Sequence, residues 1–127
     1  MNSLVDTNIF LEILLNQSRK EDCKKYIEEN VSKIAISDFT LNSIGIILFK
    51  YDKEEIFVTF TQEIVQNINV LYLPLTNFVD LVETKEKTGL DYDDSYQFLI
   101  AKKHKLEIVT LDKDFKKVEK EINVKFL

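Results

Sequence analysis

The chain has 127 residues, of which 45% are hydrophobic, and a formal net charge of −5. This length supports one domain with a sizeable core but not two, so we expect a single domain over residues 1–127. The acidic balance excludes a protein that holds nucleic acid by overall positive charge. The single cysteine, Cys23, excludes an internal disulfide, and no apolar run is long enough to cross a membrane. We therefore expect a cytoplasmic protein without a membrane anchor.

The first part of the chain predicts two strands, with helices after the first of them. A short apolar run from Asn2 to Val5 predicts the first strand. The polar turn Asp6-Thr7-Asn8 follows, and apolar residues at helical spacing from Ile9 to Leu14 predict a helix. Ser18 is placed to cap a second helix that runs to about Asn30. The segment Lys33 to Ile36 is typical of a second strand.

The middle of the chain predicts helices on either side of a third strand. Ser37 or Asp38 is expected to cap a helix from Phe39 to about Lys50, and a further helix runs from Lys53 to Gln66. The third strand runs from Asn69 to Leu73 and stops at Pro74. Thr76 is expected to cap the next helix, which ends at Gly89.

The last part of the chain carries most of the acidic signal. Asp91-Tyr92-Asp93-Asp94 opens a helix that carries its apolar stripe to Ala101. A β-branched strand, Glu107 to Leu111, follows and leads directly into Asp112-Lys113-Asp114. A short helix from Phe115 to Glu121 and a last strand from Asn123 to Phe126 complete the chain.

This alternation of strands and helices predicts an α/β fold with a parallel sheet covered on both faces. In such sheets, sites form at the carboxyl ends of the strands, where we expect Asp6, Ser37, Asp112 and Asp114. Asp94 should join them, because a short connection makes its helix antiparallel to the strand that follows. Each position also has a purely structural interpretation: Asp6 or Thr7 can cap a helix, and aspartates are common in turns after strands.

Carboxylates from separate segments that meet at one edge repel one another, and a divalent cation relieves that repulsion. Mg²⁺ or Mn²⁺ prefers such oxygen ligands, and these ions can activate water and stabilise the leaving oxygen of a phosphodiester. The chain has one histidine and one cysteine, which argues against zinc. His104 is expected to be an ordinary surface residue.

Four segments resemble the PIN-domain family, and within it most closely the VapC-type toxin ribonucleases. They are Val5 to Asn8, Ser37 to Leu48, Leu90 to Ser95 and Val109 to Phe115. The resemblance implies a sheet with strand order 3-2-1-4-5 and a metal-dependent endoribonuclease that uses Mg²⁺ or Mn²⁺. It also implies an RNA substrate, an antitoxin protein as partner and a homodimer.

The resemblance places the acidic site on Asp6, Asp94 and Asp112, with Asp114 as a frequent fourth member. Asp94 rather than Asp93 matches the family, because Asp94-Ser95 corresponds to its Asp-Ala step. Polar residues that orient the site in the family match Thr7, Asn8 and Thr110. Four lysines after the last acids are candidates for contact with RNA phosphates: Lys113, Lys116, Lys117 and Lys120.

One departure from the family pattern bears on activity. The family usually carries a glutamate early in the third helix, and that place falls on Ser43, which cannot offer a carboxylate. The alternative to an active nuclease is therefore a PIN domain of weakened or lost activity that serves as a binding or regulatory module. A phosphoacceptor receiver domain is disfavoured, because Asp6 has no adjacent acid and Pro74-Leu75 follows the third strand.

Overall fold

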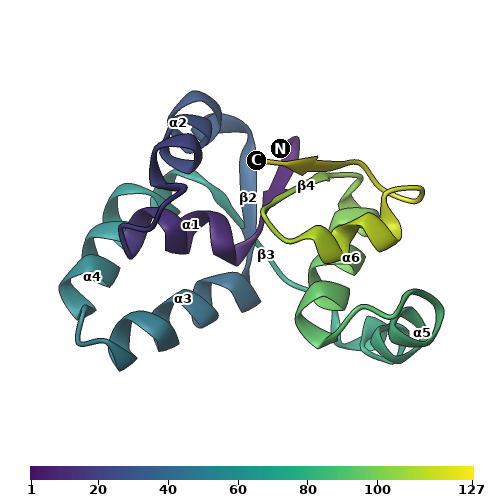
Figure 1. Ribbon diagram of the computed structural model, residues 1–127. Helices are drawn as coiled ribbons and strands as arrows, with labels where there is room; N and C mark the ends of the chain where they lie inside the picture. Colours follow the sequence, from purple (N-terminus) through teal and green to yellow (C-terminus); the bar gives the residue numbers. More distant parts are fainter.

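The computed structural model describes residues 1–127, with strands and helices that alternate along the chain (Figure 1). The strands are β1 (Ser3–Val5), β2 (Ile34–Ser37), β3 (Asn69–Leu71), β4 (Glu107–Thr110) and β5 (Val124–Phe126). The α-helices are α1 (Thr7–Leu14), α2 (Lys20–Asn30), α3 (Asp38–Lys50), α4 (Glu54–Glu63), α5 (Val79–Thr88) and α6 (Tyr92–His104). Short 3-10 helices are η1 (Val31–Lys33), η2 (Val65–Asn67), η3 (Leu75–Asn77) and η4 (Lys113–Val118).

The five strands form one sheet in the order β3-β2-β1-β4-β5, and every neighbouring pair is parallel. This order confirms the predicted topology. Strand β1 lies in the centre, where Leu4 pairs with Ala35 of β2 and with Ile108 of β4. Because all strands point the same way, the residues that follow β1, β2 and β4 gather at one edge of the sheet.

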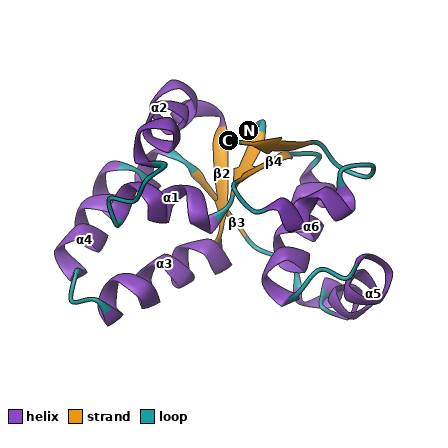
Figure 2. Cartoon of the chain, viewed as in Figure 1, coloured by secondary structure: helices purple, strands orange, loops and turns teal.

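The sheet separates two hydrophobic cores, as Figure 2 shows with the strands between two groups of helices. Neighbouring residues of β1 point to opposite faces: Leu4 joins the core beneath α5 and α6, and Val5 joins the core beneath α1 to α4. Ile108 and Val109 divide in the same way on β4. Burial on both faces explains why the central strands read as continuous apolar runs.

Local capping chemistry sets several helix ends as predicted. The Ser37 hydroxyl accepts a hydrogen bond from the backbone N–H of Thr40 and begins α3, and Asp91 caps α6 in the same way at Asp94. Gly89 ends α5 in the left-handed conformation, with a φ of 76°. None of the helices is long and apolar enough to cross a membrane.

Some predicted boundaries were wrong. Arg19, not Ser18, precedes α2, and it makes no side-chain capping bond. The predicted helix from Phe115 to Glu121 is instead the 3-10 helix η4, which begins earlier because the Asp112 carboxylate accepts the backbone N–H of Asp114. Helix α6 continues to His104, which is exposed as expected.

Candidate metal centre

Asp6 lies directly after β1 and is the N-cap residue of α1. Its Oδ1 accepts the backbone N–H of Thr7 at 2.8 Å, and its Oδ2 accepts the hydroxyl of Thr110 at 2.7 Å. The side chain is only 8% exposed, and this burial raises its pKa above the ordinary range, against the opposing effect of these hydrogen bonds. The predicted capping role of Asp6 is therefore real, but capping uses only part of its hydrogen-bonding capacity.

Asp94, Asp112 and Asp114 come together at the same edge of the sheet. Asp94 lies in the first turn of α6, and the other two lie where β4 leads into η4. One carboxylate oxygen from each lies within 4.8 Å of the others. Asp94 is buried, Asp112 is half-buried and Asp114 is exposed, so the group opens from the protein interior toward solvent.

The charges of this group act strongly on Asp94. Burial is the largest cause of a rise in the pKa of Asp94 to about 8. Further contributions to the rise come from the carboxylates of Asp91, Asp112, Asp6 and Asp114. Without a compensating cation, Asp94 therefore holds a proton at neutral pH. A cation among these oxygens would favour the ionised form instead.

Four acids were expected at the site: Asp6, Asp94 and Asp112, with Asp114 as a fourth member. Asp94, Asp112 and Asp114 form the close group, and Asp6 lies outside it. Asp6 still acts on the group through its charge, since it raises the pKa of Asp94 and Asp112 raises that of Asp6. Asp93, the alternative to Asp94, is exposed and lies outside the group.

The supporting residues Asn8 and Thr110 tie the two central strand ends together. The Asn8 amide nitrogen lies 3.5 Å from the Thr110 hydroxyl oxygen, and its carbonyl oxygen accepts the backbone N–H of Leu111 at 3.2 Å. The Thr110 oxygen also accepts the backbone N–H of Asp112 at 2.9 Å. Thr110 therefore contacts Asp6 with its proton and Asp112 with its oxygen, so one hydroxyl links the two acidic positions.

Two further polar residues of this region were missed by the sequence analysis. Thr40 of α3 is fully buried, and its hydroxyl lies 3.0 Å from that of Thr7. Gln97 of α6 is 2% exposed, and its amide nitrogen lies 2.6 Å from the Thr40 hydroxyl oxygen and 3.4 Å from Asp6 Oδ1. Their spacing carried a signal: Thr40 lies three residues after Ser37, and Gln97 lies three residues after Asp94, so each shares a helix face with a site position.

Helix α3 supplies no carboxylate to the group. Ser43 is half-buried, and its side chain makes no hydrogen bond. Asp38 is the only acid of α3, and its Oδ1 accepts the hydroxyl of Tyr96 and the backbone N–H of Phe39, both at 2.8 Å. Asp38 is thus committed to a structural contact with α6, and Ser43 leaves the site one acid short of the family pattern.

The donor atoms present suit a hard divalent cation. The group offers carboxylate oxygens only, with no histidine or thiolate among them, and Mg²⁺ and Mn²⁺ prefer oxygen ligands. The residues therefore fit such an ion.

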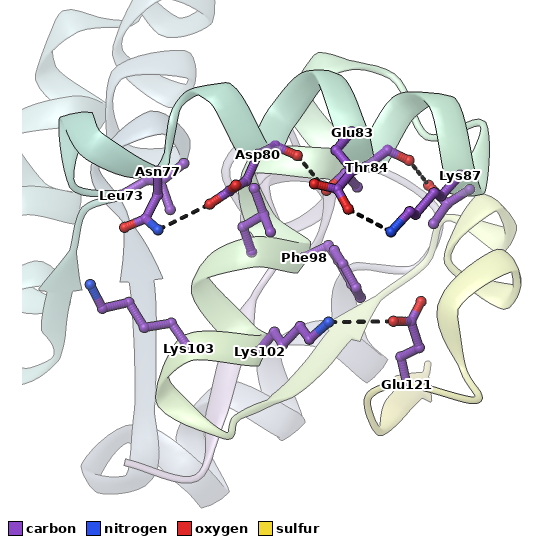
Figure 3. Close-up of a pocket in the computed structure, with 12 residues that line it drawn as sticks. Leu73, Asn77, Asp80, Glu83, Thr84, Lys87, Phe98, Lys102, Lys103 and Glu121 are labelled. Atoms are coloured by element: carbon purple, nitrogen blue, oxygen red, sulfur yellow. Dashed lines mark hydrogen bonds and ion pairs between the residues drawn. The ribbon is translucent and has the colours of Figure 1, made fainter.

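A larger hollow lies between α5 and α6, away from the acidic group. It has a volume of about 470 Å³, and Figure 3 shows charged side chains at its rim. Most of these charges pair with one another: Lys87 with Glu83, and Lys102 with Glu121 at 3.4 Å. Because these charges are mutually compensated, the hollow offers no concentrated charge to a ligand.

The fold is shared with known proteins. A family model described as the PIN domain matches residues 3–121. No curated protein matches the chain. A toxin-antitoxin complex from Klebsiella pneumoniae contains a chain with 25% sequence identity and a TM-score of 0.72, and 90% of each chain is covered.

Two further solved structures share the fold at lower identity. VapC20 of Mycobacterium tuberculosis, a toxin that cleaves the sarcin-ricin loop, has 14% identity and a TM-score of 0.78, with 91% of this chain and 93% of that chain covered. A chain of VapBC2 from Rickettsia felis, bound to a DNA fragment from its promoter, has 17% identity and a TM-score of 0.78, with 98% of each chain covered.

Proposed function

The chain belongs to the PIN domain family, and from this premise we propose that it is a metal-dependent endoribonuclease and the toxin of a type II toxin-antitoxin pair. The observation that carries the proposal is the meeting of Asp94, Asp112 and Asp114 at the carboxyl edge of the sheet, beside Asp6. These carboxylates come from α6, from the segment after β4 and from the end of β1. The neighbouring toxin structures support the same activity class.

The positions of the acidic residues suggest a different role for each. Asp94, Asp112 and Asp114 would hold Mg²⁺ or Mn²⁺, and Asp6 would complete the site from the buried side. When bound, the cation lowers the pKa of a water molecule and stabilises the charge that develops on the phosphodiester. Thr110 keeps the carboxylate of Asp6 in a single orientation, and Thr7 and Asn8 hold the start of α1 against the neighbouring elements.

The RNA path follows the exposed lysines of η4 and the residues just after it. Lys116, Lys117 and Lys120 are exposed and come shortly after the exposed carboxylate of Asp114. Lys113 lies over the ring of Phe126, 4.3 Å from its centroid, which leaves its charge at the same end of the sheet. With a net charge of −5, the protein depends on this local basic segment to attract phosphate. A ribonuclease of this kind is proposed to act in the cytoplasm.

The test is cleavage of a panel of structured and unstructured RNAs with Mg²⁺ or Mn²⁺, comparing the chain with its Asp94→Asn variant. We expect cleavage that requires the cation and is absent in the variant. Asparagine has nearly the same shape as aspartate, so a folded variant isolates the loss of the carboxylate. Equal cleavage by both proteins would show that the acidic group is not the active site.

A second candidate function is a PIN domain that binds RNA or a partner without efficient cleavage. The observation that favours it is Ser43, which leaves α3 without an acid in the group. Ser43→Glu should tighten Mg²⁺ binding in calorimetry and increase cleavage if activity is limited by this missing carboxylate. An unchanged affinity would show that position 43 does not face the cation.

We propose that each partner covers one of two exposed apolar surfaces. Helices α3 and α4 border a shallow groove at Gly45, where Ile46 is 70% exposed and Phe49 57% exposed. We assign this groove to the antitoxin, and a second apolar surface on β3 and α5 to the partner subunit of a homodimer. Phe49→Lys should prevent co-purification with the product of a neighbouring antitoxin gene, whereas Val79→Lys on α5 should not.

A further inference from the structure

Gln97 is buried at a place where glutamine is rarely found. It lies on α6 one turn after Asp94 and is 2% exposed, whereas glutamine side chains are mostly exposed in proteins. Its amide nitrogen lies 2.6 Å from the hydroxyl oxygen of Thr40 and 3.4 Å from Oδ1 of Asp6. One amide therefore joins three elements of the site: α6, α3 and the turn that follows β1.

The carbonyl oxygen of the same amide has no hydrogen-bond partner, although it is buried. A buried acceptor left unpaired costs free energy, and such atoms are rare in native proteins. Both ends of an amide are attached to one carbon, so this oxygen lies in the same buried polar region as Asp6. Because no group of the protein donates to the Gln97 carbonyl oxygen, this oxygen is free to accept a hydrogen bond from a ligand.

Thr40 and Thr7 extend the connection. The Thr40 hydroxyl is fully buried and lies 3.0 Å from the Thr7 hydroxyl, and the backbone N–H of Thr7 donates to Asp6. The side chains of Gln97, Thr40 and Thr7 thus form a closed path of contacts that begins and ends at the Asp6 carboxylate. This path restricts how that carboxylate can turn toward Asp94.

We propose that Gln97 is a positioning residue of the cation site: its amide N–H group holds the Asp6 carboxylate, and its free carbonyl oxygen accepts a hydrogen bond from a water of the hydrated cation. This inference rests on the proposed function, since it requires the acidic group to bind a divalent cation. It explains why an amide, rather than an apolar side chain, is buried at this point of α6. It also gives the site a polar oxygen in addition to its carboxylates, in a chain that has serine at position 43 where the family usually has glutamate.

The test measures Mn²⁺ affinity by calorimetry, together with the unfolding temperature in the absence of the cation. Gln97→Met keeps the length of the side chain and removes both the N–H donors and the carbonyl acceptor of the amide. We expect its affinity to fall about tenfold or more, as is typical when a residue that orients metal ligands is lost. Ile100→Val is the matched control, because Ile100 is fully buried on the same helix and belongs to the hydrophobic core. It should lower the unfolding temperature and leave the affinity unchanged.

The outcomes separate this inference from the proposed function. If the unaltered chain does not bind Mn²⁺, both fail. A second outcome is that the unaltered chain binds Mn²⁺ and Asp94→Asn does not, while Gln97→Met binds Mn²⁺ as tightly as the unaltered chain. That outcome would overturn only the role of Gln97. Thr40→Val provides a second variant should Gln97→Met not fold, because it removes the acceptor that holds the amide while nearly preserving shape. It should weaken Mn²⁺ binding at least threefold, and an unchanged affinity would overturn the proposal.

Discussion

At the scale of single residues, the buried carboxyl of Asp94 links protein stability to pH. Burial, with help from its acidic neighbours, raises its pKa from the ordinary value of 3.8 to about 8. The folded state therefore binds this proton more tightly than the unfolded state, so stability is fully present below about pH 4 and is lost progressively as the pH rises toward 8. We expect a decline of up to about 1.4 kcal/mol per pH unit in this window for the cation-free protein.

Two comparisons check that expectation by denaturant unfolding at a series of pH values. Asp94→Asn cannot ionise, so its free energy of unfolding should lack this decline and exceed that of the unaltered chain at pH 7 to 8. Saturating Mn²⁺ should also flatten the decline, because the cation favours the ionised carboxylate. If both proteins show the same decline with pH, a group other than Asp94 causes it.

Thr110 is the residue whose single hydroxyl serves two acidic positions. It donates to Asp6 Oδ2 at 2.7 Å and accepts from the backbone N–H of Asp112 at 2.9 Å, and it is fully buried. Thr110→Val should destabilise the protein by about 1–3 kcal/mol, since both buried partners lose their hydrogen bond. Thr110→Ser retains the hydroxyl and should show the smaller loss in urea unfolding, and a similar loss for both would point to packing as the cause.

At the scale of elements, the turn between α5 and α6 fixes where α6, the helix that carries Asp94, begins. Gly89 has a φ of 76°, and a Cβ at this position would meet no atom closer than the Lys117 Nζ, at 3.9 Å. A side chain at position 89 would therefore destabilise the protein through the strained left-handed backbone conformation and not through a steric clash. Gly89→Ala should destabilise the protein by about 1–2 kcal/mol in thermal or urea unfolding. Gly89→Asn should cost less, because asparagine tolerates the left-handed conformation.

At the scale of the whole molecule, the β3–α5 surface, which runs from β3 through η3 into α5, carries several exposed apolar side chains. Strand β3 is an edge strand, and Tyr72, Leu75 and Val79 are 66%, 82% and 75% exposed. Surfaces of this kind mark interaction sites. Leu75→Lys together with Val79→Lys should convert the expected homodimer to a monomer in light scattering. Val58→Lys on α4 is the control that should remain dimeric, and a dimer in both would exclude the β3–α5 surface.

Much of this molecule could be predicted from local patterns. The alternation of strands and helices, the capping of α3 by Ser37 and the end of α5 at Gly89 follow from hydrophobic periodicity and from capping and turn chemistry near each position. The strand order was implied by the family resemblance and not by these local patterns. The meeting of Asp94 and Asp112 also follows, because Asp112 comes directly after β4 and the short connection makes α6, with Asp94 near its start, antiparallel to that strand. The wrongly predicted ends of η4 and the start of α2 are places where several capping residues compete within a few positions.

What only the tertiary structure decided is how the side chains of separate elements meet. Sequence spacing could not show that Asp114 joins the close group while Asp6 is held behind it by Thr110, because this depends on side-chain directions across β1 and η4. Nor could it show that Gln97 reaches Thr40, a residue of another helix. The sequence by itself determined which acids arrive at the edge of the sheet, since that follows from the alternation of parallel strands and helices. The packing of α6 against β1 and β4 determined which of them face one another.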